Sequence, residues 1–131
     1  MKELMIRQKL DDADDELVQL ATKTVDETGI AARRNNREIM QDKQLRNVIA
    51  VADDTKSVAV VENFIKYQIG RHDEWRYHDF GEKLIGDLRR LREWARKMVE
   101  SDIEENDLAI RLVRRYLGYL MRYFVYQQKV S

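Results

Sequence analysis

The chain has 131 residues and a mass of 15.7 kDa, and its 44% apolar residues can supply one core of ordinary size. It contains no cysteine, which excludes disulfides, thiolate catalysis and cysteine metal sites, and with no proline and five glycines it has few helix interrupters. No apolar run approaches the roughly 20 residues that span a bilayer, and the first twelve residues are charged rather than signal-like. We therefore expect a single all-α domain over residues 1–131, cytoplasmic and without membrane contact.

Charge is neutral in total but uneven along the chain. The 24 basic and 24 acidic residues cancel, yet residues 1–29 carry four basic against eight acidic side chains, and residues 30–52 carry five against two. Residues 108–131 carry five basic side chains and no acidic one. This sorting is typical of a protein with one face toward an anion and another toward basic surfaces of neighbours, although short segments also differ by chance.

The N-terminal third predicts one helix and one irregular stretch. Apolar residues recur at helical spacing over residues 14–28, and Gly29 supplies a stop. The stretch 32–38, which contains Asn35-Asn36, is predicted to be a basic loop or the start of a helix.

Two shorter helices are predicted in the middle of the chain. One covers residues 37–52 and ends before an Asp-Asp-Thr turn. The other covers residues 58–69, with Ser57 as its N-cap and Gly70 closing it. The run Val58–Val61 could instead form a short strand, because it is rich in β-branched residues.

The last two helices are predicted over residues 80–100 and 108–128. Asp79 and Glu82 form a capping-box pattern before the first of them, and Ser101-x-x-Glu104 could start the second one earlier. The apolar stripes comprise Leu84, Leu88, Leu91, Ala95 and Met98 on the first helix and Leu112, Tyr116, Leu120 and Tyr123 on the second. A short connection predicts that this pair packs antiparallel, with the earlier helices completing a bundle of about five.

The two histidines do not point clearly to catalysis or metal binding. His72 and His78 lack the spacing of the common zinc motifs, so we expect no metal and no cofactor. Arg71, six residues and His78 resemble the Arg-x(4–6)-His motif of HEPN-domain ribonucleases, in which both residues act on the scissile phosphate. In that family the motif opens a long helix, whereas here it follows Gly70 in a predicted loop.

The C-terminal helix carries a ridge of arginines. Arg111, Arg115 and Arg122 follow at helical intervals with Gly118 between them, and we expect this ridge to be free of carboxylates. Guanidinium groups at one-turn spacing suit a phosphate backbone. Tyrosines of the same helix could add stacking: Tyr119, Tyr123 and Tyr126. The alternative is that these arginines pair with acidic side chains of the first helix.

Three segments carry a resemblance to a known family. They are Gln44-Leu-Arg-Asn-Val-Ile49, Asn63-Phe-Ile-Lys-Tyr-Gln-Ile-Gly-Arg71 and Tyr116-Leu-Gly-Tyr-Leu-Met-Arg-Tyr-Phe-Val-Tyr126. With them the chain resembles the small all-helical subunit of type III CRISPR effector complexes, the Csm/Cmr kind. The resemblance covers about residues 44–128.

The resemblance implies a non-catalytic role in antiviral defence. Such subunits assemble in tandem copies, contact the sugar-phosphate backbone of guide RNA and target RNA, and bridge other effector subunits. The positions that match the family's basic residues are Arg46, Lys66, Arg71 and Arg122. The ridge argument alone adds Arg111 and Arg115 as RNA-binding residues. The other interpretations are a helical protein–protein adaptor without RNA contact and a HEPN-like ribonuclease.

Overall fold

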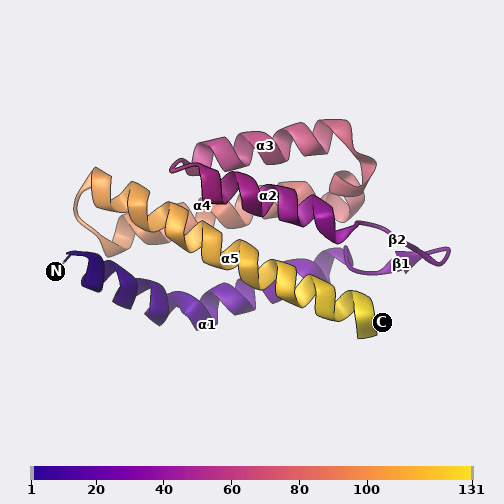
Figure 1. Ribbon diagram of the computed structural model, residues 1–131, viewed down its shortest axis with the longest axis horizontal. Helices are drawn as coiled ribbons and strands as arrows, with labels where there is room; N and C mark the ends of the chain where they lie inside the picture. Colours follow the sequence, from indigo (N-terminus) through magenta and orange to yellow (C-terminus); the bar gives the residue numbers. More distant parts are fainter. Residues whose placement is uncertain (1, 131) are drawn as a thin grey trace.

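The computed structural model describes residues 2–130 and is almost entirely helical (Figure 1). Its helices are α1 (Lys2–Thr28), α2 (Asp42–Asp54), α3 (Val58–Arg71), α4 (Phe80–Met98) and α5 (Asp102–Val130). A two-stranded hairpin, β1 (Arg33–Arg34) and β2 (Arg37–Glu38), joins α1 to α2, and a 3-10 helix, η1 (Asp73–Asp79), joins α3 to α4. The predicted all-α bundle of five helices is confirmed.

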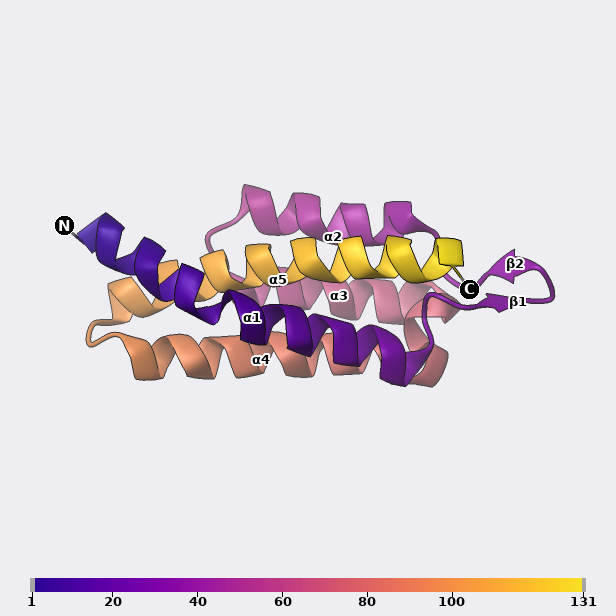
Figure 2. The same ribbon diagram turned by 90° about the horizontal axis from the view of Figure 1, so that it is seen from below.

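The two long helices α1 and α5 lie side by side along the length of the molecule, and both run from the end that holds the α4–α5 turn toward the hairpin (Figures 1 and 2). α4 runs antiparallel to α5, as the stripes predicted, and α2 packs on α5 as well. α3 lies against α2 and α4. The hairpin therefore projects beyond one end of the bundle, opposite the α4–α5 turn.

The apolar stripes of α4 and α5 form the centre of the core. Leu84, Leu88, Leu91 and Ala95 are fully buried on α4, and so are Leu112, Tyr116 and Leu120 on α5. The ends of the stripes, Met98 and Tyr123, are only half-buried. All buried apolar side chains belong to one cluster, and its burial is the main favourable term for folding.

The structure corrects the start of the first helix. α1 begins at Lys2 rather than at residue 14, because Ile6, Leu10 and Ala13 continue the buried stripe of the helix one turn at a time. Charged residues between these positions hide the periodicity but lie on the exposed side. The longer helix gives α5 an acidic neighbour along most of its length.

The basic stretch after α1 is a hairpin and not the start of a helix. Arg33 pairs with Glu38 and Arg34 with Arg37, and the turn residues Asn35 and Asn36 have φ of 54° and 66°. Two successive left-handed residues are the conformation that closes a two-residue hairpin, and asparagine adopts it readily. As a result α2 begins at Asp42 and not at residue 37.

The helix caps agree with the sequence in part. Ser57 caps α3 by accepting a hydrogen bond from the Val60 amide, and the run after it is helical, which excludes the strand. α3 continues past Gly70 to Arg71.

The capping box predicted for α4 is wrong, because Asp79 has φ of 60° and its side chain makes no cap bond. α5 uses the earlier of its two predicted starts. The Ser101 hydroxyl accepts from the Glu104 amide and donates to its carboxylate.

Candidate nucleic-acid interface

The arginine ridge of α5 is neutralised by carboxylates. Arg111 donates two hydrogen bonds to Glu3 of α1, at 2.5 and 2.7 Å, and its Nε lies 3.3 Å from Asp107 one turn earlier on α5. The expectation of a carboxylate-free ridge is therefore wrong. The bond to Glu3 raises the pKa of Arg111 and lowers the pKa of Glu3, as a bidentate pair should.

The next turn of the ridge is held in the same way. Arg115 Nη1 lies 2.9 Å from an oxygen of Asp11 and 3.1 Å from one of Asp14. Tyr119 donates to Asp14 and Tyr123 to Asp26, both at 2.7 Å, and these bonds raise the pKa of each phenol. The predicted alternative, that acidic side chains of the first helix meet this ridge, describes the structure.

Two other arginines of α5, Arg114 and Arg122, do not pair with the carboxylates of α1. Arg114 donates to the carbonyl oxygens of Ala52 and Thr55 at 2.9 Å each, so it caps the C-terminal end of α2. Arg122 lies over the Tyr119 ring at 5.8 Å from its centroid and has no carboxylate partner among residues 2–130. Of the three ridge arginines, Arg122 alone keeps an uncompensated charge.

The outer surface of α3 differs from the ridge because it exposes no carboxylate. Four exposed side chains share one stripe of this helix, here called the α3 face: Asn63, Lys66, Tyr67 and Arg71. Tyr67 is 55% exposed, and Arg71 both donates to its hydroxyl at 3.0 Å and lies 5.4 Å from its ring centroid. Lys66 has no ion-pair partner in the described part of the chain.

The only acidic residue of α3 faces inward. The Glu62 side chain is 7% exposed and accepts from Arg89 Nε at 3.1 Å and Arg92 Nη1 at 2.9 Å, both from α4. Two guanidinium groups on one carboxylate leave one net positive charge next to the α3 face. This surface therefore combines positive charge, which no exposed carboxylate of α3 neutralises, with an exposed aromatic ring.

The six residues predicted to bind RNA do not form one patch. Lys66 and Arg71 lie together on α3. Arg46 is on α2, where it pairs with Asp42 at 2.6 Å. The others are on α5: Arg111 and Arg115 in the seam with α1, and Arg122 beyond it.

The HEPN-like motif is divided between two elements. Arg71 ends α3 and contacts Tyr67, whereas His78 lies in η1 with φ of 45°, its Nδ1 3.0 Å from the Thr28 carbonyl oxygen and its ring stacked on Tyr77. No hydrogen bond or ion pair joins the two side chains within residues 2–130. The same part of the chain holds no group of three or more histidines and carboxylates that could bind a metal ion.

Sequence reasoning missed the basic hairpin as a candidate site. Its arginines are exposed, and the signal that could have found it is Asn35-Asn36 between Arg33-Arg34 and Arg37, since adjacent asparagines favour a two-residue turn.

In the described helices, none combines the length and the hydropathy needed to span a membrane. Comparison with known proteins adds no relative: no protein-family model, no curated protein and no solved structure matches the chain.

Proposed function

We propose that the chain is a non-catalytic small subunit of a type III CRISPR effector complex. In this role it contacts guide RNA and target RNA through backbone charge, in tandem with further copies, and bridges other effector subunits in the cytoplasm. The five-helix bundle supports the proposal, because the family that the chain resembles is all-helical. The three segments that carry the resemblance lie on α2, α3 and α5, which contact one another.

The observation that carries the proposal is the α3 face. It belongs to the segment Asn63–Arg71, and it presents Lys66 and Arg71 with no exposed carboxylate on the same helix. Cations of this kind release counterions from a phosphate backbone without reading sequence, and an exposed tyrosine can stack on a base or sugar. Sequence-blind contact is what a subunit needs when base pairing supplies the specificity.

The geometry also ranks the proposed RNA-binding residues. Lys66 and Arg71 come first and Arg122 second, because none of them is bound to a carboxylate. Arg46 would have to exchange Asp42 for a phosphate, which is a small cost for an exposed pair. Arg111 and Arg115 would have to give up their contacts with α1, so we assign them first to holding α1 on α5.

The test is a salt titration of RNA binding. The full chain is titrated with a labelled RNA of mixed sequence, single-stranded and duplex, between about 50 and 200 mM salt. Lys66→Glu with Arg71→Glu should weaken binding to every sequence alike and flatten the salt slope by roughly 0.7 to 0.9 per lost contact. The matched control is Lys23→Glu with Lys97→Glu, an equal charge change at exposed positions on α1 and α4.

The outcomes separate the candidate functions. If the α3 variant and the control behave alike, the α3 face is not the contact. If the wild-type chain shows no salt-dependent RNA binding but is retained by other proteins, the adaptor interpretation replaces the proposal. RNA cleavage that disappears in His78→Ala would establish the ribonuclease instead.

A further inference from the structure

The hairpin between α1 and α2 is a firmly anchored projection. Buried side chains hold both of its ends in the core, Ile30 and Ala31 before it and Met40 after it. The Ile39 amide donates to the Ala32 carbonyl at 3.3 Å, and the Gln128 amide group of α5 donates to the Met40 carbonyl at 2.7 Å. These contacts tie the base of the hairpin to the bundle, and its tip projects beyond the end of the bundle (Figure 2).

The tip concentrates positive charge that the nearby carboxylates neutralise only in part within residues 2–130. Arg34 and Arg37 stand directly opposite each other in the ladder, and neither guanidinium group has an ion-pair or hydrogen-bond partner in the chain as described. Arg33 reaches Glu38 only at 4.0 Å. Like charges directly opposite across a hairpin are destabilising. An anion bound between the two arginines would remove that repulsion.

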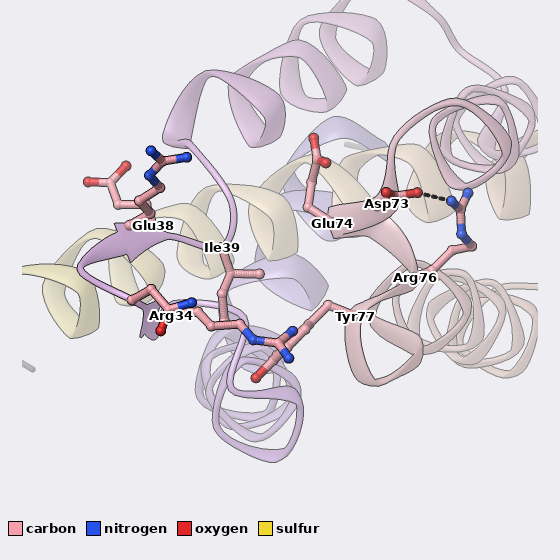
Figure 3. Close-up of a pocket in the computed structure, with 9 residues that line it drawn as sticks. Arg34, Glu38, Ile39, Asp73, Glu74, Arg76 and Tyr77 are labelled. Carbon is pink, nitrogen blue, oxygen red and sulfur yellow. Dashed lines mark hydrogen bonds and ion pairs between the residues drawn. The ribbon is translucent and has the colours of Figure 1, made fainter.

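A recess lies beside this tip. It has a volume of about 720 Å³ and is formed by the hairpin on one side and η1 on the other. Figure 3 shows Arg34 extending from the hairpin toward Tyr77 of η1, and Ile39 beside Arg34 also lines the recess. Carboxylates also line the recess: Glu38, Asp73 and Glu74.

We propose that the hairpin and this recess bind RNA, with Arg34 and Arg37 on neighbouring phosphates and one base in the recess against Tyr77. The inference rests on the proposed function, because it takes RNA as the ligand of the chain, and it adds a second contact that is distinct from the α3 face. The volume lies within the range of small-ligand sites and so has room for a single nucleotide.

The recess is lined by both arginines and carboxylates, and this combination favours a nucleotide over an acidic protein surface. A nucleotide offers phosphate oxygens to Arg34 and Arg37, and the exocyclic amino groups of its base can donate to Glu74. The other two carboxylates already have cationic neighbours, since Asp73 is paired with Arg76 and Glu38 lies 4.0 Å from Arg33. An acidic peptide would bring its carboxylates close to those three. The ring of Tyr77 completes the match, since each base has a flat face that can stack.

The test uses the full chain and a labelled single-stranded RNA of mixed sequence, with a duplex of equal length as the second probe. Arg34→Ala with Arg37→Ala should flatten the salt slope by about 0.7 per contact on the single strand. Tyr77→Ala should weaken single-strand binding roughly fivefold or more without changing the slope, because stacking carries no charge. A duplex has no free base for the recess, so Tyr77→Ala should leave duplex binding unchanged.

Two comparisons make the result decisive. Lys23→Ala with Lys97→Ala removes the same charge elsewhere and should keep the wild-type slope, and the melting of each variant shows whether it is folded. A folded hairpin variant with wild-type affinity and slope overturns this inference while RNA binding through the α3 face stands. Loss of association with an acidic protein or a second copy, with RNA binding intact, makes the hairpin a protein contact. A wild-type chain that binds no RNA removes both proposals together.

Discussion

Asp87 links three helices, and its removal should test the packing of the core. On α4, its Oδ2 accepts from the Thr24 hydroxyl of α1 at 2.5 Å and from the Tyr116 hydroxyl of α5. Tyr116 is completely buried and Thr24 is 5% exposed, so water cannot replace a lost partner. Asp87→Ala removes the charged acceptor that the two hydroxyls share.

The expected cost follows from those two hydroxyls. A buried polar group without a partner costs about 1–3 kcal/mol, and relief of the desolvation of the carboxylate offsets part of the sum. We expect Asp87→Ala to lower the free energy of unfolding by about 2 kcal/mol, a large share of the 5–15 kcal/mol typical of a domain. Urea unfolding followed by far-UV circular dichroism measures it. A variant as stable as wild type would refute the linking role of Asp87.

Asp87→Asn separates the hydrogen bonds from the charge, because the amide oxygen can still accept from both hydroxyls. Burial raises the pKa of Asp87, and the bonds from Thr24 and Tyr116 oppose that shift only in part. The native state therefore holds this proton more tightly than the unfolded state, and the contribution of Asp87 to stability falls as pH rises from the unfolded toward the folded pKa. The stability of wild type minus that of Asp87→Asn should decline across this window. A constant difference would contradict the raised pKa.

Three further predictions concern the packing. Leu88→Asp should unfold the domain, because it buries an unpaired charge in the α4–α5 core, and a fully helical variant with unchanged melting would contradict the antiparallel pairing. Glu62→Ala should lower the free energy of unfolding by about 1 kcal/mol, since Arg89 and Arg92 lose their shared acceptor but are exposed to water, and equal urea midpoints would show that this link is dispensable. Arg115→Ala should cost roughly 1 kcal/mol and lessen the loss of stability at high salt, whereas an unchanged salt dependence would mean that its α1 contacts contribute nothing.

The fold was predictable where one periodicity runs without interruption. The stripes of α4 and α5 repeat over several turns, so helix, buried face and antiparallel pairing all followed from spacing. The hairpin was not predictable in the same way, because strands of two residues have no measurable period. The start of α1 was missed for another reason. Only one position per turn is buried there, and the charged residues between these positions dominate the local hydropathy.

The candidate site was predictable only in part, because spacing identifies a helix face but not what lies opposite that face. Arg111 and Arg115 do form a ridge, and only the parallel approach of α1 decides that Glu3, Asp11 and Asp14 meet it. Opposite charge in the two segments was the available signal. The α3 face was identified by resemblance, and its lack of exposed carboxylates became clear once Glu62 was seen to face inward.

Photochemical cross-linking of the chain to bound RNA, followed by mass spectrometry, shows whether the α3 face contacts RNA. Nucleotide adducts form on residues in contact with RNA, and Tyr67 offers an exposed aromatic ring between Lys66 and Arg71. We expect adducts on the peptide that contains Tyr67, and their loss from the Lys66→Glu, Arg71→Glu variant but not from the Lys23→Glu, Lys97→Glu control. Bound RNA that yields adducts only on the seam between α1 and α5, with none on α3, would contradict this expectation.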